Sequence, residues 1–545
     1  MPTLNWIGKD AVVNHHLEVP FRLLRDVPDL SCGHPGSGNL IVEGDNLLAL
    51  KALLPHYRGK VKCVCRDPPY NTGNEGWAYN DNVNSPAIRQ WLGQTVGKEG
   101  ETLDRHDRWL CMMYPRLALL REFLCKDGSI VVFIDDNEIG NLRLLMDEVF
   151  GNSNFVANVV WEKADSPKMD SQLFSTRHDH AVIYAQNVGH YTVNRMVTAN
   201  ETPSHYNKVD SEGRRYYLKP LRAMMGGEEE KREARPNMFF GLQAPDGALV
   251  FPKTATGADG RWRWGPEKAR SEANRIEWVK GRKGWAPYFR IYADTSEGRP
   301  PETLFSHTFA GSSRLAKAEI KDIFAEGIDF ATPKPTRLIE RILQISTNPG
   351  DLILDSFAGS GTSGHSVLQM NTAEPAVEGR RFILVEMEAD IARGVTRERV
   401  RRVAEGYQNA KGAAVAGLGG GFRYVTLGEE LFDVEGRIRE MVKFADLARH
   451  VYFSETGEPL PRERVSARSP LLGVHHGRAV YLLYNGILSD KSVDGGNVLT
   501  GATLALLPPH NGPRVVYAAR CPFSKSRLER EGLIFKQTPY SIRTK

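Results

Sequence analysis

Short apolar runs alternate with amphipathic segments at both ends of the chain, and this alternation predicts an α/β fold. In the N-terminal part, the predicted elements are a strand–turn–helix unit at 40–54, strands at 61–65, 129–135, 158–163 and 180–187, and helices at 108–126 and up to Phe150. Beyond about residue 330, they are a helix at 336–346, a strand–loop–helix unit at 351–364 and a strand at 381–388.

The regular pattern fades between about 190 and 330, where Pro, Gly, Trp and charged residues dominate. We therefore expect residues 1–189 and 331–410 to form two parts of one domain, with 190–330 inserted between them. The glycine-rich residues 417–421 indicate a flexible joint. Residues 421–545 are then expected to form a C-terminal α/β extension, a candidate for oligomerisation or partner binding.

Composition narrows the class of protein. Hydrophobic residues make up 41% and charged residues 25% of the 545, which is ordinary for a globular chain of several domains. The chain has no apolar run of the roughly 18 residues that a membrane span needs, and its N-terminus lacks the pattern of a signal peptide. Six cysteines without a CxxC pair argue against a disulfide framework and against a zinc site. We expect a reduced, cytoplasmic protein with no metal.

The net charge of +5 says little, but its distribution says more. Residues 261–290 hold nine basic and three acidic residues and four of the nine tryptophans. Basic and aromatic side chains together suit a nucleic acid, although a solvated basic face over an aromatic core is an equal alternative. The residues predicted here to contact DNA are Arg261, Arg263, Lys280, Arg282 and Lys283.

A rigid turn follows the strand at 61–65. Asp67-Pro68-Pro69-Tyr70 places a carboxylate, two carbonyls and an aromatic face at the carboxyl end of that strand. The two prolines fix φ and donate no backbone hydrogen bond. A plain strand-ending turn is the alternative, since Asp and Pro are common turn residues.

A glycine-rich loop follows the strand at 351–355. Glycines let a ligand approach the backbone, and the next helix presents free N–H groups. A phosphate is disfavoured because no Walker lysine follows and because Asp355 ends the strand. The next strand ends in Glu386, the kind of acid that binds ribose hydroxyls. S-adenosylmethionine, with a ribose, a sulfonium and an amino-acid tail, fits this loop.

The two sites together indicate transfer of a methyl group to an exocyclic amine. The Asp67 carboxylate and the Pro68 carbonyl can hold the two amine hydrogens, while Tyr70 stacks on the base. Because that nitrogen is out of reach inside a duplex, the base has to be flipped out.

At this point the chain resembles a known family. The stretches that carry the resemblance are EGDNLLALKALLP (43–55), DPPYNTGNEGWAYND (67–81), HDRWLCMMYPRL (106–117), SIVVFIDDNE (129–138), SPKMDSQLFSTRHDHAVIYAQN (166–187), RPNMFFGLQAPDG (235–247), FATPKPTRLIERI (330–342), DSFAGSGTS (355–363) and FILVEME (382–388). They are similar to β-group amino-DNA methyltransferases, most closely to the modification subunits of Type III restriction-modification systems. The resemblance covers roughly residues 5–400.

The resemblance implies a doubly wound, Rossmann-like methyltransferase sheet with an inserted target-recognition domain. It implies that the target base is held by Asp67, Pro68, Pro69 and Tyr70. The implied cofactor residues are Asp355, Phe357, Gly359, Ser360, Gly361, Thr362, Glu386, Lys334, Pro335, Asp45 and Asn46. For the last four, helix capping and loop structure are the alternative.

Aspartate before the two prolines resembles the adenine-N6 enzymes, and cytosine-N4 methylation stays an alternative. Arg66 departs from the family, whose members generally carry an apolar or small residue there. It could pair with Asp67, distort the turn or point to solvent, so a DNA-binding specificity subunit with weak catalysis is a further alternative, as is an RNA or protein-amide methyltransferase. The resemblance implies double-stranded DNA, a homodimer and a helicase–nuclease restriction subunit as partners, in a bacterial or archaeal cytoplasm at the nucleoid.

Overall fold

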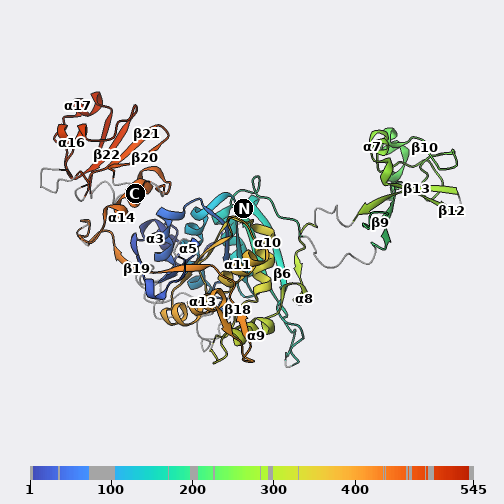
Figure 1. The fold of residues 1–545 in the computed structure, drawn as a ribbon, viewed down its shortest axis with the longest axis horizontal. Coiled ribbons are helices and arrows are strands. Elements are labelled where there is room, and N and C mark those ends of the chain that lie inside the picture. The colour runs from blue at the N-terminus through green and yellow to red at the C-terminus, as the bar shows by residue number, and fades with distance from the viewer. Residues whose placement is uncertain are drawn as a thin grey trace. The chain divides into compact units, whose positions relative to one another are not determined.

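The computed structural model divides into two compact units, 1–194 with 302–545, and 195–301 (Figure 1). The residues that it describes are 4–34, 37–72, 105–169, 171–196, 206–224, 227–282, 284–292, 299–328, 330–433, 435, 437–461, 464, 469–484, 487–488 and 496–538.

One large mixed sheet organises the first unit, in the order β1-β19-β3-β16-β15-β4-β5-β7-β6-β14. Its strands are β1 (Arg22–Asp26), β19 (Gly421–Glu430), β3 (Leu40–Glu43), β16 (Arg381–Glu386), β15 (Leu352–Asp355), β4 (Val61–Arg66), β5 (Leu124–Ile134), β7 (His178–Ala185), β6 (Phe155–Glu162) and β14 (Leu304–Phe305). Neighbours from β19 through to β5 pair in parallel, whereas β5, β7 and β6 pair antiparallel. The central strands are buried, as their unbroken apolar runs require.

Helices cover both faces of this sheet. One layer contains α3 (Asn46–Tyr57), α5 (Arg105–Phe123) and α6 (Ile139–Phe150), whose apolar side chains share a core with Val42, Val64 and Leu354. The other layer contains α10 (Thr336–Ser346), α11 (Thr362–Ala373) and α13 (Glu398–Glu405). A methyl group at Gly364 of α11 would lie 3.0 Å from Leu384 and from Val400, so this helix packs closely on the opposite face. The predicted doubly wound α/β sheet is confirmed.

The second unit is built from short strands around a small aromatic core. Its four-stranded sheet runs β12 (Ile276–Gly281), β13 (Gly284–Tyr292), β9 (Arg215–Pro220) and β8 (Lys208–Val209), and it also contains β10 (Leu242–Gln243), β11 (Leu249–Val250) and α7 (Pro266–Ser271). Leu221, Trp262, Trp264 and Phe289 form the core.

The insertion is shorter than the predicted 190–330. It ends near Pro301 because the following residues pack into the first unit. Leu304 and Phe305 extend the large sheet beside β6. Beyond them come α8 (His307–Ala310) and α9 (Ser313–Ile323), and Trp161 donates a hydrogen bond to the Gly311 carbonyl at 2.8 Å.

The C-terminal region begins inside the large sheet. Strand β19, expected to start a separate extension, pairs with β3 and β1. Two glycines here are packed tightly, because a Cβ on Gly417 would lie 2.4 Å from the Ala404 carbonyl oxygen and one on Gly421, the first residue of β19, would lie 2.4 Å from that of Cys32. Leu418 and Gly419 also donate hydrogen bonds to the carbonyls of Val403 and Ala404 in α13, so the predicted joint at 417–421 lies within the first unit.

A separate sheet follows β19. Its strands are β20 (Leu471–His475), β21 (Arg478–Leu482), β22 (Arg514–Ala518) and β23 (Leu533–Gln537), accompanied by α14 (Phe444–Thr456), α16 (Gly501–Ala505) and α17 (Lys525–Arg530). None of the described helices combines the length and the apolar character needed to cross a membrane.

Candidate active site

The candidate site lies at the carboxyl ends of adjacent parallel strands. Strands β15, β16 and β4 end in Asp355, Glu386 and Arg66, and they follow one another as β16-β15-β4. Chain order jumps between β15 and β4, so this edge is a topological switch point, where ligands bind in open α/β sheets.

Asp67 follows β4 and forms an ion pair with Lys334. Lys334 Nζ lies 2.5 Å from Asp67 Oδ2, and both side chains are largely buried, at 10% and 18% exposure. The same Nζ lies 5.0 Å from the centre of the Tyr70 ring. This ion pair joins the turn at Asp67 to the segment around Lys334, which lies 267 residues later in the chain. Both residues were predicted to belong to the site.

The turn after Asp67 is held in place by residues of α5 and by the residue that caps α6. Trp109 donates a hydrogen bond to the Pro69 carbonyl at 2.7 Å. Asn71 adopts a left-handed conformation, with φ 57°, and its side-chain amide bonds to the Arg105 carbonyl and to the buried Glu138 carboxylate. Pro68 and Pro69 are buried. These contacts fix the direction of Asp67 and Tyr70.

A cavity of about 400 Å³ opens beside this turn. Its lining includes Asp67, Pro68, Tyr70, Trp161 and Lys334. Burial, and then the nearby Asp67 charge, raise the pKa of the Tyr70 hydroxyl. The cavity therefore combines an aromatic wall, an acid and a proline, on a scale typical of small-molecule sites.

The glycine loop lies on the other side of Asp67 and Lys334. Gly359 and Gly361 adopt left-handed φ angles of 49° and 74°, and a Cβ on Gly361 would lie 2.9 Å from the Thr396 carbonyl oxygen. A second, narrow cavity of about 30 Å³ runs along this loop. The Phe330 ring lines this cavity next to Gly359. A Cβ on Gly359 would lie 3.2 Å from that ring.

The two acids predicted at this edge are buried and hydrogen-bonded. Asp355 accepts hydrogen bonds from the Phe357 backbone at 3.0 Å and from the Ser363 hydroxyl at 2.6 Å. Glu386 accepts one from the Gly359 N–H at 2.9 Å. Burial raises the pKa of Asp355 to about 6 and that of Glu386 to about 8. Ligand groups that donate hydrogen bonds would stabilise both carboxylates.

Ser360 and Thr362 join the loop to its supports. The Thr362 hydroxyl donates to the Lys334 carbonyl at 3.2 Å, while Arg399 donates to the hydroxyls of both Ser360 and Thr362. Pro335 immediately precedes α10.

Asp45 and Asn46 begin α3 at the same sheet edge. The Asp45 carboxylate caps the helix by accepting from the backbone N–H groups of Leu47 and Leu48, at 2.9 and 3.0 Å. Buried Arg116 donates to the Asn46 side chain, to Asp45 at 3.3 Å and to the Met112 carbonyl at 2.8 Å. Asp45 therefore caps α3, as the helix-capping alternative predicted. Capping uses Oδ1 of the carboxylate.

Arg66 is buried, so it neither points to solvent nor pairs with Asp67, two of the arrangements expected from the sequence. Only 1% of the residue is exposed, its guanidinium lies 4.6 Å from the Phe357 ring centre, and Nη2 lies 3.4 Å from Met113 Sδ. Burial, and then repulsion from Arg116, lower its pKa to about 9. Asp67 pairs with Lys334 instead.

Residues 61–397 match the DNA methylase family. This chain belongs to that family. The family predicted from the sequence is thereby confirmed.

Two curated relatives are similar over most of this chain. The Type III restriction-modification enzyme StyLTI Mod subunit of Salmonella typhimurium (strain LT2) is 29% identical over 433 residues, which cover 74% of this chain and 62% of that protein. The Type II methyltransferase M.KpnI of Klebsiella pneumoniae is 29% identical over 362 residues, covering 64% of this chain and 81% of the relative. The chain thus spans less than two thirds of the Salmonella relative.

A solved structure is also similar. A putative DNA modification methylase from Thermus thermophilus, complexed with S-adenosyl-L-methionine, aligns with 67% of this chain and 95% of its own, at 13% identity and a TM-score of 0.30.

The predicted DNA contacts divide into two groups. Arg261 is buried and donates to the Glu229 carbonyl at 2.6 Å, and Arg263 donates to the carbonyls of Pro220 and Arg222. These bonds do not support Arg261 or Arg263 as phosphate contacts, because both support the insertion's own backbone. Lys280 and Arg282 are exposed near the turn between β12 and β13, and Lys283 lies outside the described residues.

Sequence reasoning missed several residues that shape the site. Arg116 bonds to Asp45 and Asn46. Arg399 bonds to Ser360 and Thr362. Lys163 lines the larger cavity and pairs with Asp179 at 2.6 Å. Arginines inside a helix carry no local signal of burial, so Arg116 and Arg399 could be found only from the folded chain.

Proposed function

We propose that this protein is a site-specific DNA methyltransferase that transfers a methyl group from S-adenosylmethionine to the N6 amine of a flipped-out adenine. One observation carries the proposal. Asp67 and Lys334 form a shared wall between the cavity that contains Tyr70 and the glycine loop that contains Asp355. A base held on one side and a cofactor held on the other would meet at that wall.

The residues at the glycine loop fit S-adenosylmethionine. The buried Glu386 carboxyl suits ribose hydroxyls and Asp355 suits a donor-rich, cationic ligand, while the glycines leave room that a Cβ would fill. The narrow cavity of about 30 Å³ holds little more than one water molecule. We propose that the Phe330 ring, which lines this cavity beside Gly359, moves away when the cofactor enters. When bound, the cofactor supplies an electrophilic methyl group.

The chain's own residues act on the target amine. Asp67 accepts a hydrogen bond from the amine and stabilises the positive charge that the nitrogen gains as it becomes tetrahedral. Pro68 is proposed to accept the second amine hydrogen through its carbonyl, and the Tyr70 ring stacks on the base. Because Lys334 occupies Oδ2 of Asp67, we propose that Lys334 leaves for the cofactor's carboxylate when the site is filled.

The burial of Arg66 bears on the alternatives. A DNA-binding subunit with weak catalysis was suggested by the idea that Arg66 might disable Asp67. Arg66 instead lies against Phe357, and Asp67 pairs with Lys334. Adenine stays the preferred base over cytosine because an aspartate precedes the two prolines, as in the adenine enzymes that the chain resembles.

Methyl transfer to unmodified genomic DNA, followed by nucleoside analysis, tests this function. The expected product is N6-methyladenine, and N4-methylcytosine would replace the adenine proposal with the cytosine one. Asp67→Ala should lower turnover by a factor of about 10²–10³ while both ligands still bind. The matched control is Asp10→Ala, which changes an exposed aspartate that is distant from Asp67 in the sequence. Near wild-type turnover in Asp67→Ala would refute the mechanism.

The relatives' names support proposals about partners. Since the Salmonella relative is a Type III Mod subunit, we propose double-stranded DNA as substrate, a homodimer, and a separate restriction subunit that supplies any cleavage. Light scattering of the purified chain, with and without DNA, measures the oligomeric state. A monomer under both conditions would exclude the dimer.

A further inference from the structure

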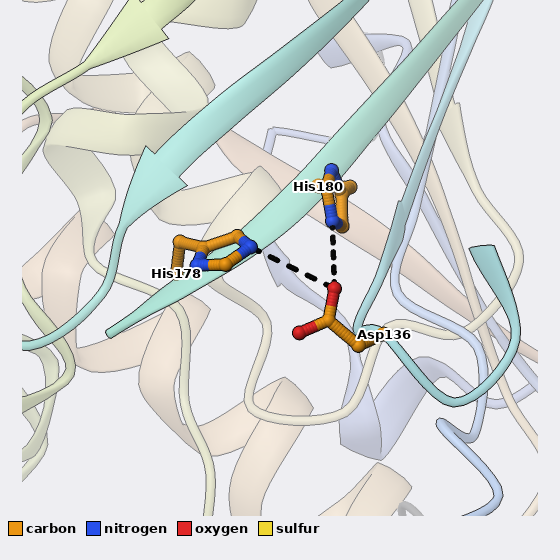
Figure 2. Close-up of side chains that lie close together, drawn as sticks. All are labelled: Asp136, His178 and His180. Carbon is orange, nitrogen blue, oxygen red and sulfur yellow. Dashed lines mark hydrogen bonds and ion pairs between the residues drawn. The ribbon is translucent and has the colours of Figure 1, made fainter. Parts of the chain in front are cut away.

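Three potential metal ligands converge on the far side of the strand that lines the cavity beside Tyr70, called the base-sized cavity from here on. His178 and His180 lie on β7, and Asp136 follows β5 (Figure 2). Asp136 Oδ1 lies 3.2 Å from His180 Nε2 and 3.6 Å from His178 Nε2. The three ligand atoms all lie within 4.8 Å of one another.

The sheet itself creates this arrangement. Side chains two apart on a strand share a face, so His178 and His180 point to one side of β7 and Asp179 to the other. Asp179 lines the base-sized cavity together with Asp135, the residue that follows β5. Strand β5 pairs with β7 up to Ile134, opposite His180, which brings the following Asp136 over the two rings.

The spacing suits a tetrahedral ion. Zinc lies about 2.0–2.2 Å from nitrogen and oxygen ligands, so ligand atoms around a tetrahedral zinc are about 3.3–3.6 Å apart. The two distances to Asp136 lie close to that range. Asp136 is 57% exposed, which leaves an open path for an ion and a fourth position for water.

Asn158 provides a second, independent observation. Its Nδ2 lies 3.2 Å from His180 Nδ1, while its Oδ1 is buried without a hydrogen-bond partner among the described residues. Without a metal, His180 donates from Nε2 to Asp136, so Nδ1 can only accept. With a metal on Nε2, Nδ1 carries the proton, and a flipped Asn158 amide would accept it through Oδ1. The flip moves the amide N–H₂ to the position that Oδ1 held, and what metal binding gains is an Nδ1–H···Oδ1 hydrogen bond that fixes the tautomer and orientation of His180.

We propose that Asp136, His178 and His180 bind one divalent transition metal ion, with Zn²⁺ as the probe, and that Asn158 orients His180 from behind. Two imidazoles and a carboxylate are a donor set that such ions favour. The ion ties the start of β7 to the loop after β5. It therefore holds Asp179 and Asp135, two carboxylates of the base-sized cavity, at a fixed separation. The site is distinct from the methyl-transfer residues.

Calorimetric titration of the metal-free full chain with ZnCl₂ tests the proposal. One equivalent should bind, and Co²⁺ should give the visible absorption of a tetrahedral site. His178→Ala with His180→Ala should weaken Zn²⁺ binding more than tenfold. Because that pair of changes could disturb β7, Asp136→Asn is a second variant at an exposed position and should weaken binding in the same direction. The matched control is His475→Ala with His476→Ala. It removes a second pair of histidines whose rings also lie edge to face, and it should leave zinc binding unchanged.

Asn158→Leu separates the positioning role from ligation. It should raise the Kd for Zn²⁺ by a factor of about 10–100 and preserve the one-to-one stoichiometry. Asn158→Asp should restore the affinity, because a carboxylate accepts the Nδ1 proton. Equal zinc binding by wild type and by the His178, His180 double variant would overturn the metal site. An unchanged Kd in Asn158→Leu would overturn the role of Asn158.

Discussion

Replacing Arg66 by methionine should stabilise the protein. Arg66 is fully buried, and its guanidinium contacts the Phe357 ring and the Met113 sulfur. Arg116 repels its charge, and Asp355 offsets only part of the cost of burial and repulsion. Methionine has a similar length, fills the same space and brings no charge.

The pKa of Arg66 sets the magnitude. Its fall from 12.5 to about 9 corresponds to an upper bound of about 5 kcal/mol of destabilisation at neutral pH, at about 1.4 kcal/mol per pH unit. Since the folded pKa is the lower one, the unfolded chain binds more protons between pH 9 and 12.5, and the penalty is complete below that window. Loss of the contact with Phe357 offsets about 0.5–2 kcal/mol, so we expect a net gain of about 1–4 kcal/mol.

Urea unfolding followed by tryptophan fluorescence measures the effect, because buried Trp109 lies on the same helix as Met113. The midpoint should rise for Arg66→Met. Arg116→Met is the matched control. That arginine is equally buried but holds Asp45, Asn46 and the Met112 carbonyl, so its loss should cost about 3–5 kcal/mol. A lower midpoint for Arg66→Met would refute the reasoning and show that the buried charge is compensated.

Three further outcomes are expected. Gly361→Ala should weaken S-adenosylmethionine binding at least tenfold in calorimetry, because φ is 74° and the new Cβ would meet the Thr396 carbonyl oxygen at 2.9 Å; an unchanged Kd would contradict the loop assignment. Glu386→Gln should flatten a loss of stability between pH 4.5 and about 8 in thermal melts. The folded pKa is the higher one, so folding binds a proton there and stability falls as pH rises. Lys280→Ala with Arg282→Ala should reduce the salt slope of DNA binding by about 1.8, and unaltered slopes would return the turn to a solvated face.

Local sequence patterns predicted most of the fold. The helix at 336–346 coincides with α10, and the strand ending at Asp355 coincides with the end of β15. These elements are long or strongly apolar, so their periodicity decides their structure. The boundary of the insertion was missed because β14 has two residues and no detectable pattern.

The sequence could not predict which charged side chains are buried. Arg66 ends an apolar strand, and Arg261 lies in a basic window that appeared solvent-facing. Both are buried by segments distant in sequence, Arg66 by Phe357 and Arg261 by the backbone around Glu229. The tryptophans at 262 and 264 do form a core of the insertion, as the alternative of an aromatic core under a basic face predicted. Burial depends on packing between segments, which local composition does not encode.

The charge pattern at the sheet edge explains why the site suits one class of ligand. Asp67, Asp355 and Glu386 come together because β4, β15 and β16 are neighbours. Burial disfavours the ionised forms of Asp355 and Glu386, and the Asp67 charge raises the pKa of Asp355 further. A phosphate would add to that repulsion, whereas a ligand with hydroxyls, an ammonium and a sulfonium would relieve it. Arg66 and Lys334 supply positive charge while the site is empty. Lys334 is proposed to exchange Asp67 for a ligand carboxylate, whereas Arg66 is enclosed by Phe357 and Met113. Its charge lowers the pKa of Asp355 and so favours the ionised form of that carboxylate, and Arg66→Met should therefore raise the pKa of Asp355 while it stabilises the fold.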